Sequence, residues 1–284
     1  MGLKVMGIGG CGRNILALLA KQKVGAELIY ADGKMDRWIE GIRKIQLHRN
    51  NINPILDILQ GNDPLLIAFG LGGNSGEIYM PEILRFVQSR PNTFFFVVKP
   101  FSFEGVFHLN NAEKEMQIIR ESGVRYMVRD NQEMEKLGDK ISFMEALQKS
   151  LEIAPLVHAL TWLYGKNDCG EENVYGGTPL SDVISGGEFN YTFTTVNGEE
   201  KVEKIEAFLR NLHADPRFGN VYALISGRDI SVGESLDLAR FSADFAESHR
   251  KFVAPETNEN LFGAPIHEWN VIAIHTVVSE AAAE

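Results

Sequence analysis

The stretch Gly7-Ile-Gly-Gly-Cys-Gly-Arg-Asn14 follows directly on the apolar run Leu3-Lys-Val-Met6. A second glycine-rich turn, Gly70-Leu-Gly-Gly-Asn-Ser-Gly76, follows the run Leu65-Leu-Ile-Ala-Phe69 in the same way. Each segment has the pattern of a strand, a tight glycine loop and a helix. Glycine lets backbone N–H groups turn toward an anion, and the following helix N-terminus adds partial positive charge. Two such loops in one domain predict that the phosphates of a nucleotide are bound from both sides.

The composition is that of a globular protein. The chain has 284 residues, of which 44% are hydrophobic and 23% are charged, enough for one large domain or two ordinary ones. Its formal net charge of −10 argues against a nucleic-acid-binding surface, which is normally basic. This charge does not exclude an anionic nucleotide, because local N–H groups bind phosphate whatever the charge of the whole protein. We therefore expect no nucleic-acid partner.

The cysteines and the apolar runs indicate where the protein works. Cys11 and Cys169 form neither a metal-ligand spacing nor a disulfide framework, which favours the reducing cytoplasm. The N-terminal residues enter a predicted strand at once, so we expect no signal peptide. The apolar runs fall short of the roughly 20 residues that a membrane helix needs. We expect no direct membrane insertion.

The first 130 residues alternate between strand and helix patterns. Strands are predicted near residues 3–8, 26–30, 65–69, 93–98 and 124–128, and helices near 12–21, 35–45, 76–89, 105–122 and 131–137. This alternation predicts a Rossmann-like α/β domain, in which helices cover both faces of a parallel sheet. Ligands of such sheets bind at the C-terminal ends of the strands, where both glycine loops are expected.

The second half of the chain has a different pattern. A long central helix is predicted near 142–164, with Pro155 expected to kink or divide it, and a polar loop follows. A smaller α+β unit is then predicted, with strands near 189–196, 220–226, 250–254 and 270–278 and helices near 199–212 and 233–247. We therefore expect a nucleotide-binding domain in residues 1–140, a central helix and loop in 141–187, and a C-terminal α+β domain in 188–284.

The first loop alone allows a different function. Gly7-x-Gly9-x-x-Gly12 is similar to the dinucleotide fingerprint, which expects an acidic residue about 20 positions on, and Asp32 satisfies this. An oxidoreductase that uses a nicotinamide cofactor is therefore one hypothesis. It leaves the second glycine loop unexplained.

Three further segments favour another family. Lys99-Pro-Phe-Ser-Phe-Glu-Gly105 ends a predicted strand and opens a helix, Asp130-Asn131 follows the fifth strand, and Ile225-Ser-Gly-Arg-Asp-Ile-Ser-Val-Gly-Glu-Ser-Leu236 forms a strand-turn-helix. Together with the two glycine loops, in this order, they resemble the tubulin/FtsZ family of GTPases over about residues 3–278. The segment that begins at Lys99 is the most specific, because it matches the FtsZ form almost letter for letter.

The resemblance implies a guanine nucleotide, GTP or GDP, at the sheet edge, and a Mg²⁺ ion that screens the phosphates when a triphosphate is bound. Glu104 would contact the ribose, and Asp130 and Asn131 fall where the family contacts guanine. Asp32 also remains a nucleotide-binding candidate. The candidates from the two glycine loops are Gly9, Gly10, Cys11, Asn14, Gly70, Gly72, Gly73, Asn74, Ser75 and Gly76.

The second loop departs from the family signature Gly-x-Gly-Gly-Gly-Thr-Gly-Thr-Gly. Asn74 and Ser75 replace a glycine and a threonine, and Glu77 and Ile78 replace a threonine and a glycine. The Glu77 carboxylate is expected to repel a phosphate unless a cation or an outward rotamer intervenes. His108 stands where FtsZ typically has an arginine.

The catalytic segment departs further. FtsZ hydrolyses GTP between subunits, with carboxylates of an Asn-x-Asp-x-x-Asp loop, and the best match here is Gly177-Thr-Pro-Leu-Ser-Asp182. Only Asp182 is kept, although Asp168, Glu171 and Glu172 lie nearby in the sequence. The resemblance implies a cytoskeletal protein of the cell-division type that associates head-to-tail, with Asp182 as the catalytic candidate.

One other reading of the resemblance remains open. A non-hydrolysing, nucleotide-gated regulator is the alternative to the filament-forming enzyme. The sequence ends soon after its last predicted strand, so we expect none of the tail by which FtsZ docks membrane adaptors.

Overall fold

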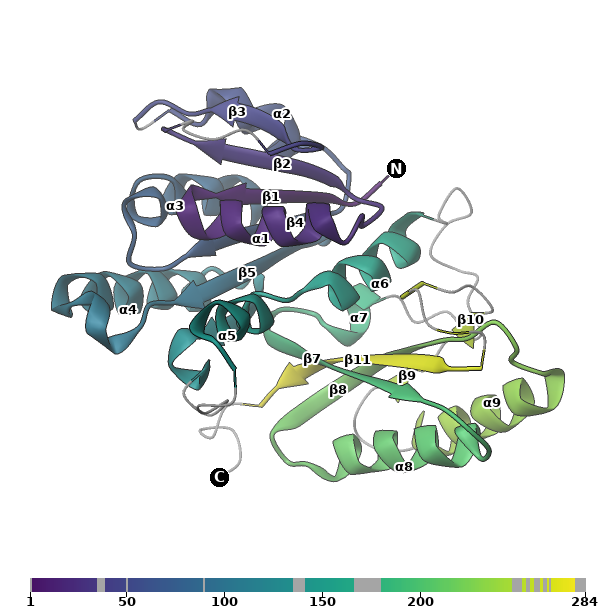
Figure 1. Ribbon diagram of the computed structural model, residues 1–284. Helices are drawn as coiled ribbons and strands as arrows, with labels where there is room; N and C mark the ends of the chain where they lie inside the picture. Colours follow the sequence, from purple (N-terminus) through teal and green to yellow (C-terminus); the bar gives the residue numbers. More distant parts are fainter. Residues whose placement is uncertain are drawn as a thin grey trace. The chain divides into compact units, whose positions relative to one another are not determined.

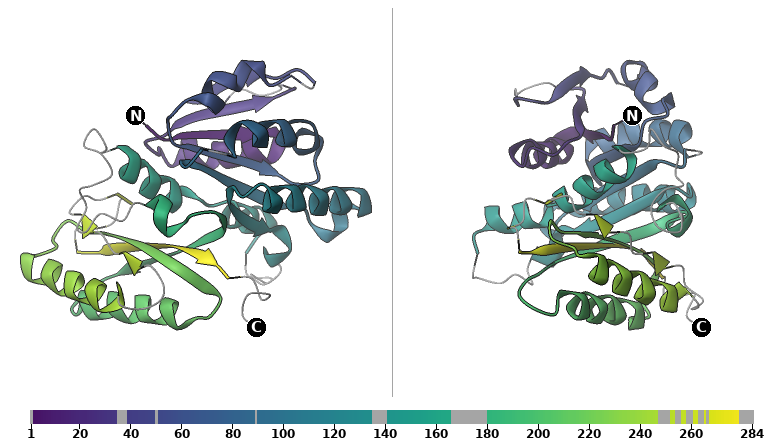
Figure 2. Two further views of the ribbon diagram at one scale, coloured as in Figure 1. Left: turned by 180° about the vertical axis from the view of Figure 1, so that it is seen from behind. Right: turned by 90° about the vertical axis from the view of Figure 1, so that its right-hand side faces the viewer.

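The structure of the protein is a computed structural model that divides into two compact units, residues 1–157 and 158–284 (Figures 1 and 2). The residues that the structure describes are 2–34, 39–49, 51–88, 90–134, 141–165, 180–246, 252–253, 256–257, 261–262, 265 and 267–278.

The first unit is built on a parallel sheet with the strand order β6-β5-β4-β1-β2-β3. Its strands are β1 (Lys4–Ile8), β2 (Glu27–Asp32), β3 (Arg43–Gln46), β4 (Leu65–Gly70), β5 (Thr93–Lys99) and β6 (Arg125–Asp130). The central strands β1 and β4 are buried along almost their whole length. Their sequences are apolar except for Lys4 at the start of β1, because helices cover both faces of the sheet.

The helices that connect these strands are α1 (Gly9–Lys21), α2 (Leu56–Gln60), α3 (Asn74–Val87) and α4 (Val106–Glu121), with short 3₁₀ turns at Asn53–Ile55 and Ser102–Glu104. Of these helices, α1, α3 and α4 were predicted from the sequence, whereas α2 was not. The α1 helix lies on one face of the sheet, in front of it in Figure 1. The other three pack their buried side chains into one core on the opposite face. The predicted α/β architecture is confirmed.

The prediction of a helix over residues 35–45 is wrong for its C-terminal part. Residues 43–46 form the edge strand β3, which pairs in parallel with β2. Ile45 is buried between a lysine and a glutamine, which is the period-two pattern of a half-buried strand. Gly41, with a φ of +76°, lies in a turn just before the strand. Residues 35–38 lie outside the described residues.

The central helix is not one long helix. It consists of α5 (Phe143–Ser150) and α6 (Ala154–Gly165). Pro155 has no N–H to donate to the residue four positions before it, which disfavours one continuous helix, and it is accommodated in the first turn of α6. The sequence predicted this division as one of two outcomes. The Ser142 side chain caps α5 by accepting the Glu145 N–H.

The second unit is the predicted smaller α+β unit. Its antiparallel core has the order β8-β11-β7, and the short strands β9 and β10 pair in parallel with β8. The strands are β7 (Gly187–Val196), β8 (Phe218–Ser226), β9 (Phe252–Val253), β10 (Glu256–Thr257) and β11 (Trp269–Val277). The helices are α7 (Leu180–Val183), α8 (Lys201–Ala214) and α9 (Val232–Ala246). A core around Trp269 joins α8 and α9 to this sheet.

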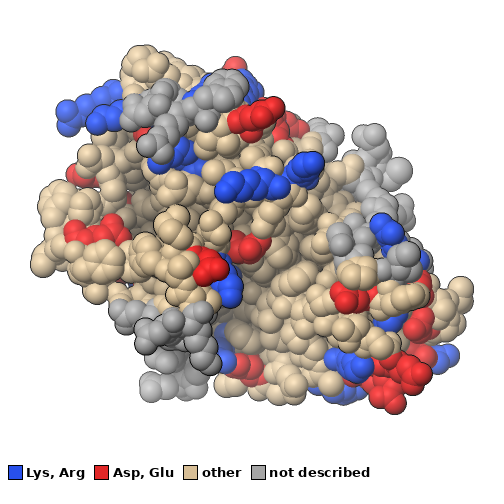
Figure 3. All heavy atoms as spheres, viewed as in Figure 1, with Lys and Arg blue, Asp and Glu red and all other residues tan. Residues whose placement is uncertain are grey.

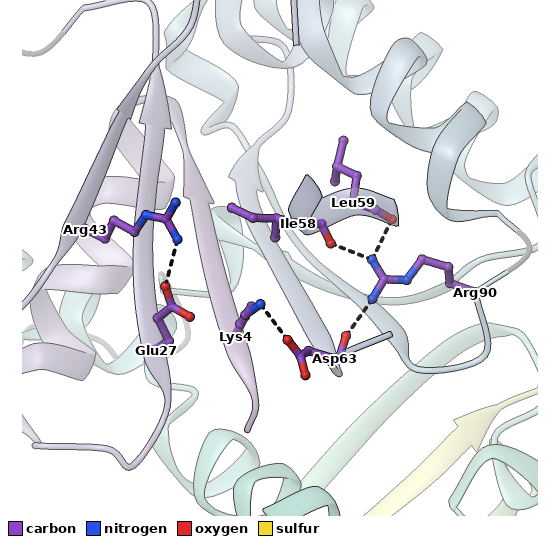
Figure 4. A network of polar contacts seen from close by, with 7 residues as sticks. All are labelled: Lys4, Glu27, Arg43, Ile58, Leu59, Asp63 and Arg90. Atoms are coloured by element: carbon purple, nitrogen blue, oxygen red, sulfur yellow. Dashed lines mark hydrogen bonds and ion pairs between the residues drawn. The ribbon is translucent and has the colours of Figure 1, made fainter. Parts of the chain in front are cut away.

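A polar network fixes the N-terminal edge of the first unit's sheet (Figure 4). Arg90 donates from Nη1 to the carbonyl oxygens of Ile58 and Leu59, at 2.8 and 2.6 Å, and from Nη2 to that of Asp63, at 2.6 Å. The Asp63 carboxylate also pairs with Lys4 Nζ at 2.6 Å. One guanidinium therefore ties the end of α2 to the segment that enters β4.

We predict that Arg90→Ala lowers the free energy of unfolding by about 2–3 kcal/mol, because part-buried carbonyl groups lose a charged donor. Chemical denaturation measures this change. Arg43→Ala is the matched control, since exposed Arg43 makes one contact with Glu27 at 3.2 Å (Figure 4). This control is expected to cost less than about 0.5 kcal/mol. Equal losses in the two variants would contradict the role given to Arg90.

Candidate functional site

The two glycine loops lie side by side at the point where the order of the strands in the sheet reverses. The register pairs Ile8 with Phe69, so the C-terminal ends of β1 and β4 are adjacent. The chain builds the sheet outward through β2 and β3 on one side of β1, and through β4, β5 and β6 on the other. Such a switch point opens a crevice between the loops that follow the two strands, which is where α/β sheets bind ligands.

The first loop is shaped by close approaches that only glycine allows. A Cβ on Gly7 would lie 2.5 Å from the carbonyl oxygen of Gly12, and a Cβ on Gly12 would lie 2.6 Å from that of Ala68. Gly9 has a φ of +68° and begins α1. No side chain caps α1, and its first turn carries no acidic residue. Its N-terminal N–H groups are therefore open to an anion.

The second loop meets the first. A Cβ on Gly70 would lie 2.9 Å from Cys11 Cβ, and one on Gly9 would lie 2.9 Å from Ser75. The α3 helix begins at Asn74 after the N-cap residue Gly73, and no side chain caps it either. Two uncapped helix N-termini thus start from loops in contact with each other. This arrangement can bind one polyanion with two sets of N–H groups.

Helix α4 holds the second loop at Gly72. Gly72 has a φ of +75°, and its N–H donates to Glu115 Oε2 at 2.7 Å. Its carbonyl oxygen accepts a hydrogen bond from His108 Nδ1, also at 2.7 Å. The Gly72 N–H is therefore used inside the protein. Gly72 was a candidate for phosphate binding, but its N–H is not available to a ligand.

The Glu115 carboxyl group is an unusual neighbour for an anion site. Glu115 is 4% exposed, and its Oε1 has no hydrogen-bond partner among the described residues. Burial raises the pKa of Glu115 to about 7, the Gly72 N–H opposes this, and the charge of Glu77 adds to it. Glu115 was not among the site residues predicted from the sequence. The sequence feature that could have indicated a buried role for Glu115 is its position on the apolar stripe of α4, beside Ala112, Met116 and Ile119.

The chain is similar in sequence to cell division proteins named FtsZ. No protein-family model matches it. It is 28% identical to cell division protein FtsZ 2 of Rhizobium meliloti over 169 residues, which are 51% of this chain and 49% of that protein. The match thus spans about half the length of that relative. It is 25% identical to FtsZ of Pseudomonas aeruginosa over 279 residues, 87% of this chain and 70% of that protein.

Solved structures agree over nearly the whole chain. An empty FtsZ dimer from M. jannaschii superposes with a TM-score of 0.69 at 17% identity, covering 98% of this chain and 88% of that one. CetZ2 from Haloferax volcanii, as a GTPγS-bound protofilament, gives 0.68 at 13% identity, covering 99% and 94%. The chain has the FtsZ/tubulin-like fold. CetZ1 from the same organism, as a GDP-bound monomer, gives 0.68 at 13% identity, covering 99% and 95%.

In this FtsZ-like chain, Asp32 is occupied by protein donors. Its Oδ1 accepts the Ser75 hydroxyl at 2.9 Å and the Gly33 N–H at 2.8 Å, and its Oδ2 accepts the Tyr30 hydroxyl at 3.0 Å. Asp32 therefore links the end of β2 to the first turn of α3. These bonds leave less of the carboxylate for a ribose, which weakens the dinucleotide hypothesis.

Glu104 and Cys11 lie near each other at the edge of the first glycine loop. Glu104 is exposed, and its Oε1 accepts the Phe101 N–H at 2.8 Å. Burial, and then the charge of Glu104, raise the pKa of the Cys11 thiol to about 12, so Cys11 stays protonated at neutral pH. Asn14 is exposed on α1.

The candidate base-contacting residues, Asp130 and Asn131, lie at the C-terminal end of β6, which is two strands from β4. This corresponds to about 10 Å across the sheet, a span that a nucleoside can cover from its phosphates. Asp130 Oδ1 accepts the Gln132 N–H at 2.9 Å. Asn131 is 9% exposed, and its Oδ1 has no hydrogen-bond partner among the described residues. A buried amide oxygen of this kind can accept an N–H from a base.

The acidic candidates for catalysis come from the segment around α7. Asp182 belongs to α7 by its backbone, but its side chain lies outside the described residues, as do Asp168, Glu171 and Glu172.

Among the residues that are described, no group of three His, Cys, Asp or Glu side chains could hold a metal ion. No described helix is long and apolar enough to cross a bilayer. On the face in Figure 3, acidic and basic side chains lie intermixed.

Proposed function

We propose that the protein is a guanine-nucleotide-binding, FtsZ-like cytoskeletal protein. One observation carries this proposal: α1 and α3 start without side-chain caps from two glycine loops in contact at the switch point of the sheet. Gly9, Gly10 and Cys11 would donate to the phosphates from one side, and Gly73 to Gly76 from the other. Residues 1–140 would carry the nucleotide, 141–187 would connect, and 188–284 would supply a second interaction surface.

The remaining parts of the ligand have candidate partners. Glu104 would contact the ribose from the edge of the first loop, and Asn131 would accept an N–H of guanine with its unpartnered Oδ1. A Mg²⁺ ion would be held mainly by phosphate oxygens of GTP, as is usual for this ion. The GDP-bound and GTPγS-bound states of the CetZ structures support this choice of ligand.

The test is to identify the nucleotide that purified protein releases on denaturation, followed by calorimetric titration with GDP and ADP. We expect released GDP or GTP and a dissociation constant for GDP at least tenfold below that for ADP. Released NAD or NADP would favour the oxidoreductase hypothesis. No measurable binding of any nucleotide would overturn the proposal.

The same proposal includes head-to-tail self-association. Large apolar side chains are exposed beside Glu104, with Phe103 73%, Val106 72% and Phe107 65% exposed. In the second unit, Val232 is 78% and Leu236 is 53% exposed at the start of α9. We propose that the first group of one copy packs against the second group of the next. The protofilament and dimer forms of the structural neighbours support such pairing.

A mixing experiment tests the head-to-tail pairing. With GTP and Mg²⁺, the unmodified protein is expected to form large assemblies, whereas Phe107→Glu and Val232→Glu should each stay monomeric. In a mixture, the intact Val232 surface of the first variant can still pair with the intact Phe107 surface of the second, because the interface joins two different surfaces. Dimers should therefore appear by analytical ultracentrifugation. Dimers in either variant alone would contradict the pairing.

Asp182 is the proposed carboxylate for inter-subunit hydrolysis. Phosphate release that rises cooperatively with protein concentration, and falls in Asp182→Asn, would support a filament-forming enzyme. Absence of release at every concentration would favour the non-hydrolysing regulator.

A further inference from the structure

Two side chains of α4 act on one residue of the second glycine loop. Glu115 accepts the Gly72 N–H and His108 donates to the Gly72 carbonyl oxygen, both at 2.7 Å. Because a carbonyl oxygen can only accept, the Nδ1 atom of His108 must carry the proton of this bond. The backbone of α4 is also close, since a Cβ on Gly72 would lie 2.2 Å from the carbonyl oxygen of His108.

These contacts fix the orientation of the next peptide group. The carbonyl of Gly72 and the N–H of Gly73 belong to one trans peptide, so they point in opposite directions. Since His108 holds the carbonyl toward α4, the Gly73 N–H points away from α4. No acceptor among the described residues takes this N–H. A flip of the same peptide would instead turn a carbonyl oxygen toward the outside of the loop.

We propose that His108 and Glu115 are positioning residues, which hold the peptide between Gly72 and Gly73 in the one orientation that offers the Gly73 N–H to a phosphate. This inference rests on the proposed nucleotide function. Neither residue touches the ligand. The interaction would reduce the cost of ordering the loop when the nucleotide binds.

The geometry favours this role over simple packing. A buried carboxyl group with one unpartnered oxygen is costly to keep, and an apolar side chain would fill the same space without that cost. The charged or titratable groups that face this point are Glu115 and His108 from α4 and Glu77 from the first turn of α3. A phosphate added near them brings further negative charge. It should therefore favour the protonated form of Glu115.

The first test compares His108→Ala with His108→Asn by calorimetric titration with GDP. Loss of one hydrogen bond to the loop should weaken GDP binding about tenfold in the alanine variant. An asparagine amide can donate from nearly the same position as Nδ1, so His108→Asn should recover most of the affinity. Asn110→Ala, exposed on the same helix, is the control that should match the unmodified protein.

The second test measures proton uptake. Titrations with GDP at pH 7 in buffers of different ionisation enthalpy give the number of protons bound with the nucleotide. The unmodified protein should take up a fraction of a proton more than Glu115→Gln, which keeps an acceptor for the Gly72 N–H but does not titrate. A direct structural readout is the amide NMR signal of Gly73, which should shift in His108→Ala and return in His108→Asn.

The outcomes separate this inference from the proposed function. If the unmodified protein does not bind GDP, the proposed function fails. If it binds GDP and all three His108 and Glu115 variants bind equally with equal proton uptake, the positioning role is wrong and the proposed function stands. Loss of affinity in His108→Asn as large as in His108→Ala would also overturn the role of the donor.

Discussion

Gly72→Ala is expected to abolish measurable GDP binding and to lower the free energy of unfolding by about 3 kcal/mol. Two costs add at this position. The left-handed backbone, with a φ of +75°, disfavours any residue with a Cβ. The new Cβ would also lie 2.2 Å from the carbonyl oxygen of His108, which is held in the first turn of α4. Either the loop or the helix must move, and the bonds that Gly72 makes with α4 would be lost.

Gly123→Ala is the matched control for this change. Gly123 has a φ of +72°, but a Cβ there would meet no heavy atom within 4 Å. It should cost about 1 kcal/mol and leave GDP affinity unchanged. Denaturation curves and calorimetric titrations of both variants make the comparison. Equal losses in both would mean that the close approach to α4 contributes nothing.

Gly10→Asp is expected to weaken GDP binding at least about 100-fold without destabilising the fold. Gly10 is exposed in the first turn of α1, its φ is not in the left-handed region, and a Cβ there would meet no heavy atom within 4 Å. A carboxylate near a helix N-terminus is stabilising by about 0.5 kcal/mol. The same carboxylate would repel the phosphates proposed to lie there.

Gly10→Asn is the control, because it has the same size and no charge. Its dissociation constant for GDP should lie within about tenfold of that of the unmodified protein. This limit corresponds to about 1.4 kcal/mol of binding free energy. Calorimetric titration of the two variants isolates the effect of charge. Equal affinities in the two would place the phosphates away from α1.

Much of the fold could be predicted from local pattern. The strands β1 and β4 are apolar, except for Lys4, because both of their faces are covered, and the glycines that follow them mark the turns into α1 and α3. The strand at 43–46 was missed because it is short, lies at the sheet edge and contains two basic residues. Its identity depends on pairing with β2, which local sequence does not encode.

The candidate site could be predicted only in part. The structure brings both glycine loops together, as their positions after two strands implied. The internal bonds of the loops could not be foreseen, because Glu115 reaches Gly72 from 43 residues away and Ser75 reaches Asp32 across the same separation in sequence. Both depend on how α3 and α4 pack against the sheet. They determine which of the predicted groups remain free for a ligand.

The central claim is that the N-termini of α1 and α3 together bind the phosphates of one nucleotide. Amide hydrogen exchange, with and without saturating GDP, tests it most directly, because a bound ligand slows the exchange of the N–H groups that it engages. The account predicts slower exchange in peptides that cover residues 9–14 and 73–77, and unchanged exchange around Arg90, at the opposite edge of the sheet. Saturation with GDP that leaves both loops unprotected would contradict it.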